Sequence, residues 1–167
     1  PLFTDMYHYG TISNLLQLIK LPDGTMKVLV EGLKRCKIDK LIEEDTYTKA
    51  RVSEIADIPV KASEATSLVR FTKAKFADYV SITKRIPQEI VASIDALDDL
   101  PRLIDTIIGH LPIELNRKQE VLEQADMQKR AETLLTFIES QLDVVDVEKK
   151  IRDRVKKQME KSQREYY

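Results

Sequence analysis

The chain has 167 residues, of which 43% are hydrophobic and 33% charged, and it contains no Trp. This length holds one ordinary domain or two small ones, and the composition is typical of a soluble, helix-rich protein. No apolar run is long enough to cross a membrane, and the first residues lack the features of a signal peptide. The single cysteine, Cys36, excludes an intramolecular disulfide and fits a reducing compartment, so we expect a cytoplasmic protein.

Charge is unevenly distributed along the sequence. Residues 1–60 carry a net charge of −1, residues 61–147 carry −4, and residues 148–167 carry +4 from eight basic and four acidic side chains. An acidic body with a basic end is one pattern of a nucleic-acid-binding protein. The alternative is a solvated helix whose charges pair at i,i+4, such as Glu148–Arg152 and Asp153–Lys157. The second interpretation is favoured because no aromatic residue alternates with these basic residues before the last two positions.

Residues 10–58 predict β structure that opens with a hairpin. Thr11–Ile19 is rich in apolar residues and leads into Leu21-Pro22-Asp23-Gly24-Thr25. Pro fixes φ for the first central position of a turn, Asp tolerates the second, and Gly supplies the positive φ that follows. The return strand is Met26–Glu31, in which Met26, Val28 and Val30 share one face.

Gly32 interrupts this strand and predicts a bulge or sharp bend, which allows a sheet to curl. The strand continues through Leu33–Ile42, turns over Glu43–Asp45 and returns along Tyr47–Ile58. Three or four strands with such a corner form a partial barrel or sandwich, whose open edges need further strands or a helix to cover them. We therefore expect at least one more strand of this module upstream of Pro1.

Residues 61–125 predict a helical bundle. Lys61–Thr83 contains no helix breaker, and a second helix starts at Ile86-Pro87, with Pro near its first position. Asp98-Asp99-Leu100-Pro101 ends that helix and caps a third, which Gly109 and Pro112 close. Asn116-Arg117-Lys118-Gln119 has the spacing of a capping box and predicts a short helix through Leu122.

Residues 126–167 predict one long helix, because Asp126 is a good N-cap residue and neither Pro nor Gly follows it. The first apolar stripe comprises Leu134, Ile138, Leu142 and Val145, and a second comprises Val144, Val147, Ile151, Val155 and Met159, so the stripe changes face near Val145. The second stripe is too narrow for a globular core. It is typical of a helix that leaves the body to meet another helix.

The sequence offers almost no catalytic or metal-binding pattern. The four glycines are too dispersed for a phosphate-binding loop, and neither His8 nor His110 has a partner at metal-ligand spacing. Cys36 lies between Arg35 and Lys37 but has no placed base, so a packed or idle thiol is the favoured interpretation. Met6, Tyr7, His8 and Tyr9 form an aromatic cluster that is either a recognition surface or, preferably, packed against an upstream strand.

Two long stretches carry a family resemblance. The first is Lys20-Leu21-Pro22-Asp23-Gly24-Thr25-Met26-Lys27-Val28-Leu29-Val30-Glu31-Gly32-Leu33, and the second runs from Val147-Glu148-Lys149-Lys150-Ile151-Arg152 through Lys156 to Tyr166-Tyr167. They resemble the hairpin of the N-terminal domain and the linker helix of the bacterial Lon proteases. Asp99–Leu111 and Lys118–Glu123 fall in the same order as in that family, so the resemblance covers essentially the whole chain.

The resemblance implies an α+β fold and a piece of an ATP-dependent serine protease of the AAA+ class. It implies an incomplete PUA-like β module over residues 1–60, a helical bundle over 61–125, and a long helix over 126–167 that completes the bundle and leads towards an ATPase domain. The Walker motifs and the Ser–Lys dyad of the family match nothing here. We therefore expect no catalytic, cofactor or metal site in these residues, and ATP and Mg²⁺ in another domain.

The resemblance also implies a role in recognising unfolded, damaged or tagged proteins and in supporting a hexameric ring. The candidate substrate contacts are Met6, Tyr7, Tyr9, Leu21 and Pro22, and the candidate assembly contacts are Val155, Met159, Tyr166 and Tyr167. The alternative function is a nucleic-acid-binding or coiled-coil scaffold module that uses the basic terminal helix. The sequence gives DNA binding no specific support, and it predicts no membrane partner.

Overall fold

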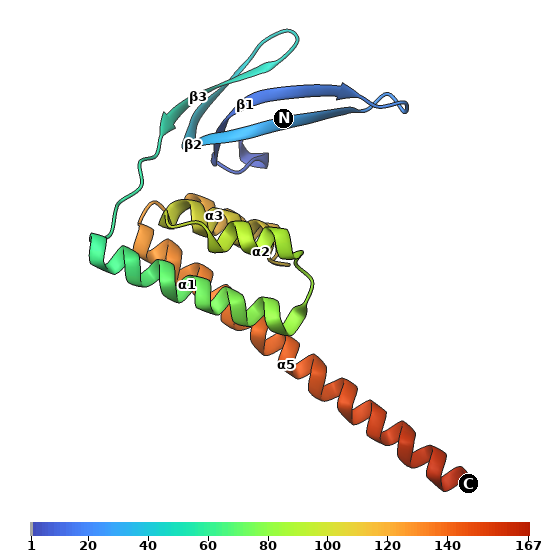
Figure 1. Ribbon diagram of the computed structural model, residues 1–167. Helices are drawn as coiled ribbons and strands as arrows, with labels where there is room; N and C mark the ends of the chain where they lie inside the picture. The colour runs from blue at the N-terminus through green and yellow to red at the C-terminus, as the bar shows by residue number, and fades with distance from the viewer. Residues whose placement is uncertain (1) are drawn as a thin grey trace. The chain divides into compact units, whose positions relative to one another are not determined.

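The computed structural model describes residues 2–167 and has an α+β fold, as predicted (Figure 1). A short 3-10 helix, η1 (Phe3–Asp5), precedes strands β1 (Tyr9–Lys20), β2 (Met26–Glu43) and β3 (Thr48–Glu54). Five helices follow: α1 (Ala62–Thr83), α2 (Gln88–Asp95), α3 (Leu100–Gly109), α4 (Leu115–Glu123) and α5 (Met127–Tyr166). They form two compact units. One contains the residues up to Ile58 together with Gln119–Ala125, and the other contains Pro59–Lys118 with Asp126–Tyr167.

The first unit is built on an antiparallel sheet in the order β1-β2-β3. The predicted hairpin turn is confirmed: the Gly24 amide donates to the Leu21 carbonyl at 3.0 Å, and Gly24 follows the turn with a φ of +88°. This geometry, a tight turn followed by a left-handed residue, matches the right-handed twist of the flanking strands. The Asp23 carboxylate accepts hydrogen bonds from the Thr25 amide at 2.9 Å and the Thr25 hydroxyl at 2.6 Å.

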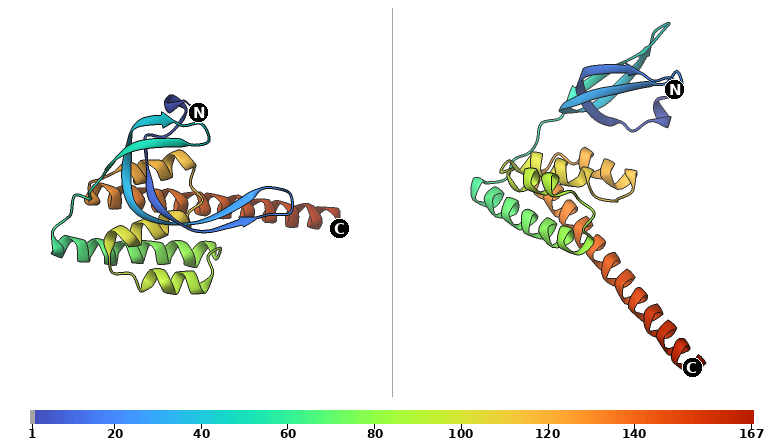
Figure 2. Two further views of the ribbon diagram at one scale, coloured as in Figure 1. Left: turned by 90° about the horizontal axis from the view of Figure 1, so that it is seen from above. Right: turned by 45° about the vertical axis from the view of Figure 1, so that its right-hand side comes forward.

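Three irregularities bend the strands of this sheet. The register shifts past Leu33 on β2, past Leu16 on β1, and past Asp39 on β2, so each of these residues is an extra residue without a direct partner. The first shift lies beside Gly32, where the sequence predicted a bulge. A Cβ atom at Gly32 would come within 3.1 Å of Thr11 Cγ2, so the strands approach closely there. The bulges explain the strong curvature of the sheet in Figure 2.

The segment Gln119–Ala125 lies with the sheet, whereas residues 61–125 were expected to form one helical bundle. The Gln119 side chain donates to the Tyr9 carbonyl at 3.0 Å, and Arg35 Nε donates to the Leu122 carbonyl at 3.0 Å. The Ile58 amide donates to the Ala125 carbonyl at 2.9 Å. The last two bonds satisfy carbonyl groups at and beyond the C-terminal end of α4, which have no partner within the helix. The segment therefore covers one end of the sheet.

The second unit packs α1, α3 and α5 around an aliphatic core, with α2 against α1 and α3. Its apolar side chains with no exposed surface are Leu103, Ile104, Ile107, Ala131, Leu134 and Ile138, and Thr72 and Arg130 are equally buried among them. Polar side chains tie the helices together at the surface. Lys73 of α1 donates to the Asp95 carbonyl at 2.6 Å and contacts the Asp98 carboxylate at 3.2 Å, while Lys75 of α1 pairs with Glu139 of α5.

The N-terminal ends of three helices can be compared with the residues that the sequence predicted for them. Asp126 caps α5 as predicted, because its carboxylate accepts from the Lys129 amide at 3.1 Å. The capping box at Asn116 is wrong: α4 already begins at Leu115, and the Glu114 carbonyl accepts from the amides of Arg117 and Lys118. Pro87 is the N-cap of α2 rather than its first helical residue. No side chain caps the first turn of α2, where the Pro87 carbonyl accepts from the amides of Ile90 and Val91.

Helix α5 passes from a buried to an exposed environment within one unbroken helix (Figures 1 and 2). Leu134 and Ile138 have no exposed surface, Leu142 and Val145 are half-buried, and all residues from Asp146 onward are exposed. The sequence predicted this change near Val145. The outer half of α5 therefore projects from the bundle, with its side chains exposed to solvent.

We expect truncation of the two halves of α5 to have different effects on stability. Leu134→Ala removes a fully buried side chain and should lower the free energy of unfolding by about 2–5 kcal/mol, because it leaves a cavity between packed helices. Met159→Ala, on the exposed half, should change it by less than about 0.5 kcal/mol. Urea unfolding followed by circular dichroism measures both changes, and equal destabilisation by the two variants would contradict the assignment of the core to one half.

Candidate functional site

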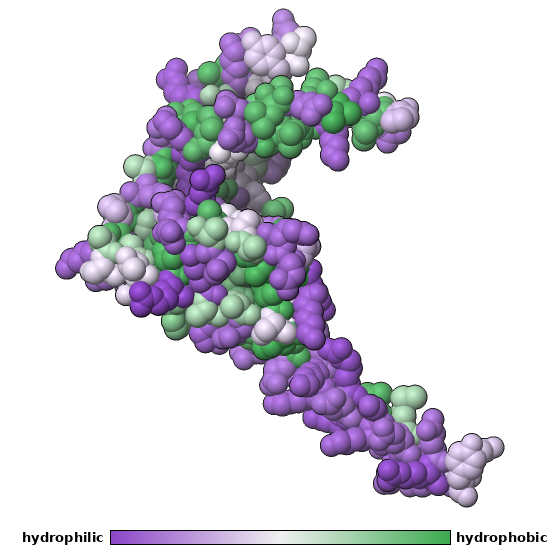
Figure 3. Space-filling view, viewed as in Figure 1, coloured by the Kyte–Doolittle hydropathy of each residue, from purple (hydrophilic) through white to green (hydrophobic). Residues whose placement is uncertain are grey.

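The hairpin β1–β2 presents an apolar face to solvent. Leu15 pairs with Val30 and Leu18 pairs with Val28, so these four side chains share one face, with Met26 beyond them. The bulge at Leu16 brings Leu15 and Leu18 onto that same face although they are three residues apart. Their exposed fractions lie between 45% and 64%. We call Leu15, Leu18, Met26, Val28 and Val30 the hairpin face; Figure 3 shows apolar surface along this part of the chain.

The same strands have unpaired backbone edges. Strand β3 pairs with β2 only from Cys36 onward, and the Ile55 amide extends this contact to the Arg35 carbonyl. Within residues 2–167, no strand lies beside β2 residues 26–34 on the side away from β1, nor beside the outer edge of β1. Such edges offer backbone N–H and C=O groups to an extended chain. A cavity of about 340 Å³, lined in part by Leu33 and Ile55, lies where β3 ends.

The candidate contacts Leu21 and Pro22 lie at the tip of the hairpin, where both are exposed. The two hydrogen bonds from Thr25 stabilise the charged form of Asp23 and hold the pKa of its carboxyl below its ordinary value. The tip is therefore ordered by a local contact between Asp23 and Thr25. It holds Leu21 and Pro22 at the end of the hairpin face.

The aromatic cluster at the start of the chain is partly folded onto itself. The His8 ring stacks on Phe3 with 4.1 Å between ring centroids, and His8 Nε2 lies 3.2 Å from the Phe3 carbonyl. Tyr9 is half-buried beneath the Lys37 ammonium, which lies 5.8 Å from its ring centroid. Met6 and Tyr7 are exposed. Of the three candidate contacts in this cluster, Met6 and Tyr7 are thus accessible and Tyr9 is only partly so.

The outer half of α5 carries a second exposed apolar surface. We call Val144, Val147, Ile151, Val155 and Met159 the α5 stripe; each is between 45% and 61% exposed. At about 100° per residue these side chains fall within a third of the helix circumference, and Tyr166 falls on the same line. Tyr166 packs edge-on against Tyr167, with 5.9 Å between ring centroids. The four candidate assembly contacts are therefore all exposed, and Val155, Met159 and Tyr166 share one face.

The charges that flank the α5 stripe lie in solvent. The ion pairs predicted for Glu148–Arg152 and Asp153–Lys157 are not formed; Asp146 and Lys150 instead form an i,i+4 pair at 3.1 Å. Surface pairs of this kind contribute little to stability. The stripe, rather than the charges, is the feature of this helix that needs a partner.

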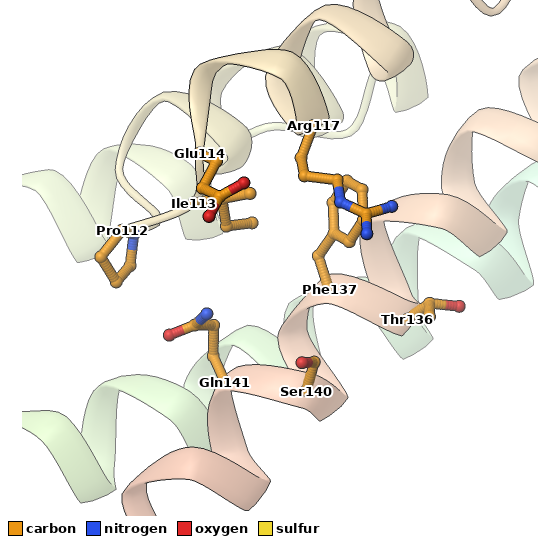
Figure 4. Close-up of a pocket in the computed structure, with 8 residues that line it drawn as sticks. All are labelled: Pro112, Ile113, Glu114, Arg117, Thr136, Phe137, Ser140 and Gln141. Carbon is orange, nitrogen blue, oxygen red and sulfur yellow. The ribbon is translucent and has the colours of Figure 1, made fainter.

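A third feature is a cavity of about 460 Å³ in the helical unit (Figure 4). One wall consists of Pro112, Ile113 and Glu114, which connect α3 to α4, together with Arg117 from the first turn of α4. The other wall is a face of α5 that carries Thr136, Phe137, Ser140 and Gln141. In Figure 4 the side chains of Ser140 and Gln141 point from α5 towards the opposite wall.

The described residues contain none of the usual signs of a metal site. Among residues 2–167, no three His, Cys, Asp or Glu side chains come together in a way that could hold a metal ion. Cys36 is buried in the sheet. None of the described helices has the length and apolar character needed to cross a bilayer. Three features of the described residues are accessible to a partner: the hairpin face with its edges, the α5 stripe and the cavity beside Gln141.

A comparison with protein-family models decides the family. Residues 1–140 match the model of the substrate-binding domain of the ATP-dependent protease La (Lon). This chain belongs to the Lon substrate-binding domain family. The resemblance seen in the hairpin and in the terminal helix is confirmed.

Bacterial Lon proteases are similar to the chain over all or nearly all of its length. Lon protease of Escherichia coli K12 is 45% identical over 167 residues, which are 100% of this chain and 21% of that protein. Lon protease of Brucella suis is 44% identical over 162 residues, or 97% of this chain and 20% of that protein. The chain thus spans about a fifth of the length of these Lon proteases.

Solved Lon domains share the fold. The N-terminal domain of Mycobacterium avium complex Lon protease superposes with a TM-score of 0.70 at 22% identity, covering 81% of this chain and 72% of that one. A Lon N-terminal domain protein from Xanthomonas campestris gives a TM-score of 0.53 at 16% identity, covering 81% and 71%. At these identities the likeness establishes the fold alone.

Two parts of the candidate surface in this Lon-family chain were missed by the sequence reasoning. The hairpin face was predicted as strand, with Met26, Val28 and Val30 together, but Leu15 and Leu18 of the opposite strand were not placed on it. The neighbouring apolar pairs Leu15-Leu16 and Leu18-Ile19 break the strict alternation of a half-buried strand and were the available signal. The cavity beside Gln141 had no signal, because its two walls are about twenty residues apart and neither contains a motif.

The depressed pKa of Asp23 predicts a pH-dependent hairpin tip. A depressed carboxyl pKa contributes stability above its unfolded-state value and loses that contribution as pH falls through the folded-state value. Thr25→Ala should raise the Asp23 pKa towards its ordinary value, because both hydrogen bonds involve Thr25 and one of them uses its hydroxyl. Thr25→Ser keeps both donors and should leave the pKa low. NMR titration of the Asp23 carboxyl measures this, and identical titration in both variants would disprove the assigned cause.

Proposed function

We propose that this chain is the non-catalytic substrate-recognition region of a Lon-type ATP-dependent protease, which binds unfolded, damaged or tagged proteins. The observation that carries the proposal is the exposed hairpin face, with five large apolar side chains on one side of an open-edged hairpin, in a chain of the Lon substrate-binding family. Exposed apolar surface of this kind is typical of interaction sites. The catalytic and ATP-binding steps, with Mg²⁺, belong in this proposal to other domains of a cytoplasmic AAA+ serine protease that acts in protein quality control under stress.

The hairpin suits an unfolded chain better than a folded one. An extended segment can lie along the free edge of β2 and form backbone hydrogen bonds that do not depend on its sequence. Its apolar side chains can then contact Leu18 and Val28 on the hairpin face. A typical folded protein pairs most of its backbone groups and buries most of its contiguous apolar segments, so it makes these contacts less well. We further propose that the sheet forms part of a PUA-like barrel, which curvature at the three bulges supports.

The α5 stripe supports a second role in assembly. Its five members are roughly half exposed, and the helix is otherwise covered with charge. Helices with an apolar seam of this width associate with a matching helix. We propose that the stripe and Tyr166 contact other copies of the chain, within a hexameric ring of the whole protease. Several weak client sites held in one ring would also gain affinity through high effective concentration.

Client binding is tested by titrating one fluorescently labelled protein, in its folded and its chemically unfolded form, at low and high salt. The chain should bind the unfolded form more tightly, and the preference should persist at high salt because apolar contacts are not screened. The double variant Leu18→Gln/Val28→Thr should weaken binding at least about tenfold, since each replacement removes part of the apolar contact.

The matched control is Val52→Thr, which makes a similar change on β3, outside the hairpin. It should bind the unfolded protein as the wild type does. Equal binding of folded and unfolded protein would contradict the proposal. Binding that occurs only to added duplex DNA, and that weakens steeply with salt, would favour the nucleic-acid alternative instead.

Assembly is tested in the full-length protease by size-exclusion chromatography with light scattering over a dilution series. Val155→Gln/Met159→Gln should shift dissociation to at least about tenfold higher protein concentration, because it makes the α5 stripe polar. Tyr166→Ala/Tyr167→Ala should act in the same direction, without changing the unfolding of the present chain.

The control for the stripe is Asp153→Gln/Lys157→Gln. These residues lie on the opposite face of α5, and removing one acid and one base leaves the net charge unchanged. The control should assemble normally. If it dissociates as readily as the stripe variant, the effect comes from helix charge or helicity, and the stripe has no specific role.

A further inference from the structure

The free edge of β2 from Met26 to Gly32 is a regular stretch of strand without a neighbour on one side. Strand β3 pairs with β2 only from Cys36 onward, so among residues 2–167 this stretch has β1 beside it and no second strand (Figure 1). It contains no bulge, because the extra residues nearby are Leu16 of β1 and Leu33, just past the stretch. Its outward backbone N–H and C=O groups can therefore pair with another strand in register.

The side chains of this edge are complementary to themselves about Leu29. When two such edges pair antiparallel around a two-fold axis at Leu29, residues equally far before and after it face each other. Lys27 of each copy then lies opposite Glu31 of the other, and Val28 lies opposite Val30. Opposite charges and β-branched side chains in directly opposed positions stabilise an antiparallel pair. The edge thus matches a second copy of itself.

The charges on the edge select this register over its neighbours. A two-fold axis at Lys27 or at Glu31 would place like charges directly opposite each other, which destabilises the pair. An axis at Val28 would place Lys27 opposite Leu29, and an axis at Val30 would place Glu31 opposite Leu29. Among residues 2–167, Lys27 and Glu31 are exposed and form no ion pair, so both charges are available to a partner.

The same register carries the hairpin tip of the second copy to a cavity on the first. With the axis at Leu29, Gly24 of the second copy lies opposite Lys34 of the first. Lys34 and Ile55 belong to the lining of the cavity of about 340 Å³ at the end of β3. The tip brings its exposed apolar residues, Leu21 and Pro22, to this place. The second copy therefore takes over the edge of β2 where β3 leaves it.

We propose that the free edge of β2 pairs with the same edge of a second copy of the chain, with the two-fold axis at Leu29. The result is a continuous antiparallel sheet in the order β1-β2-β2-β1. The axis is perpendicular to the sheet, so the hairpin faces of both copies lie on the same side and join into one apolar surface.

This pairing closes the edge of β2 to an extended client, a consequence that rests on the proposed client-binding function. A client and the second copy need the same backbone N–H and C=O groups, so they compete for them. The contact consists of two short strands and the hairpin tips, which is small for a specific interface. The copies therefore separate readily, and unfolded protein can displace one of them.

The test is a set of charge reversals in the intact chain, measured by sedimentation equilibrium. All variants carry Val155→Gln/Met159→Gln, which removes association through the α5 stripe, and this background should show a monomer–dimer equilibrium. Lys27→Glu and Glu31→Lys each place like charges opposite each other twice, so each should weaken the dimer at least about tenfold. Lys27→Glu/Glu31→Lys together restore opposite charges and should recover it. An equimolar mixture of the two single variants should form mixed dimers, because every acid again faces a base.

The matched control is Lys40→Glu, which makes the same change of charge on the part of β2 that pairs with β3. It should dimerise as its background does. The pairing is overturned if the background stays monomeric, if the double reversal does not recover the dimer, or if Lys40→Glu weakens it as much as Lys27→Glu. Growth beyond the dimer would also overturn it, because a two-fold pairing of this edge is closed.

Closure of the edge is tested by adding the chemically unfolded protein to the dimer. The unfolded protein should shift the equilibrium towards monomers that carry it. If it binds and the dimer persists unchanged, the two do not compete and the closure is wrong. If it binds none of the variants, the client-binding function and the closure both fail, whereas the charge reversals still decide the pairing.

Discussion

Packing of the first half of α5 against α1 and α3 is the interaction on which the helical unit depends. Ala131, Leu134 and Ile138 have no exposed surface, and each apolar side chain of the larger kind contributes roughly 1.5–3 kcal/mol when it is buried. The backbone hydrogen bonds of α5 run unbroken to Tyr166. The direction of the exposed half is consequently set by the buried half, and the α5 stripe is held away from the bundle without any contact of its own.

The two halves of this helix use different faces. At about 100° per residue, the stripe is centred roughly a third of a turn around the axis from the buried residues. If the apolar residues of both halves lay on one continuous face, a partner of the outer half would bind on the same side of α5 as α1 and α3. The rotation instead separates the surface that completes the bundle from the surface that remains free. One wall of the cavity beside Gln141, which includes Phe137, belongs to the buried half of α5. The same packing therefore fixes the direction of its side chains.

Sequence periodicity predicted the elements whose signals are local. The turn at Leu21–Thr25, the bulge beside Gly32, the cap at Asp126 and the change of stripe near Val145 all follow from residues within a few positions of each other. The errors arose where contacts between residues distant in the sequence determine the local structure. Asn116 has capping spacing, but α4 begins one residue earlier because the connection from α3 already presents the Glu114 carbonyl. The sequence pattern places Gln119–Ala125 in the bundle. Two of its carbonyls nevertheless accept hydrogen bonds from Arg35 and Ile58, some 65–90 residues away in the chain. The cavity beside Gln141 could not be predicted for the same reason, because its walls come from separate stretches of the sequence.

The hairpin would recognise an extended chain mainly through its backbone and its apolar surface area. Backbone bonds along a free strand edge are nearly independent of sequence, and apolar contact scales with buried area, so the hairpin would hold many segments with modest affinity. A region that must accept many unfolded proteins while rejecting folded ones needs binding that is nearly independent of sequence.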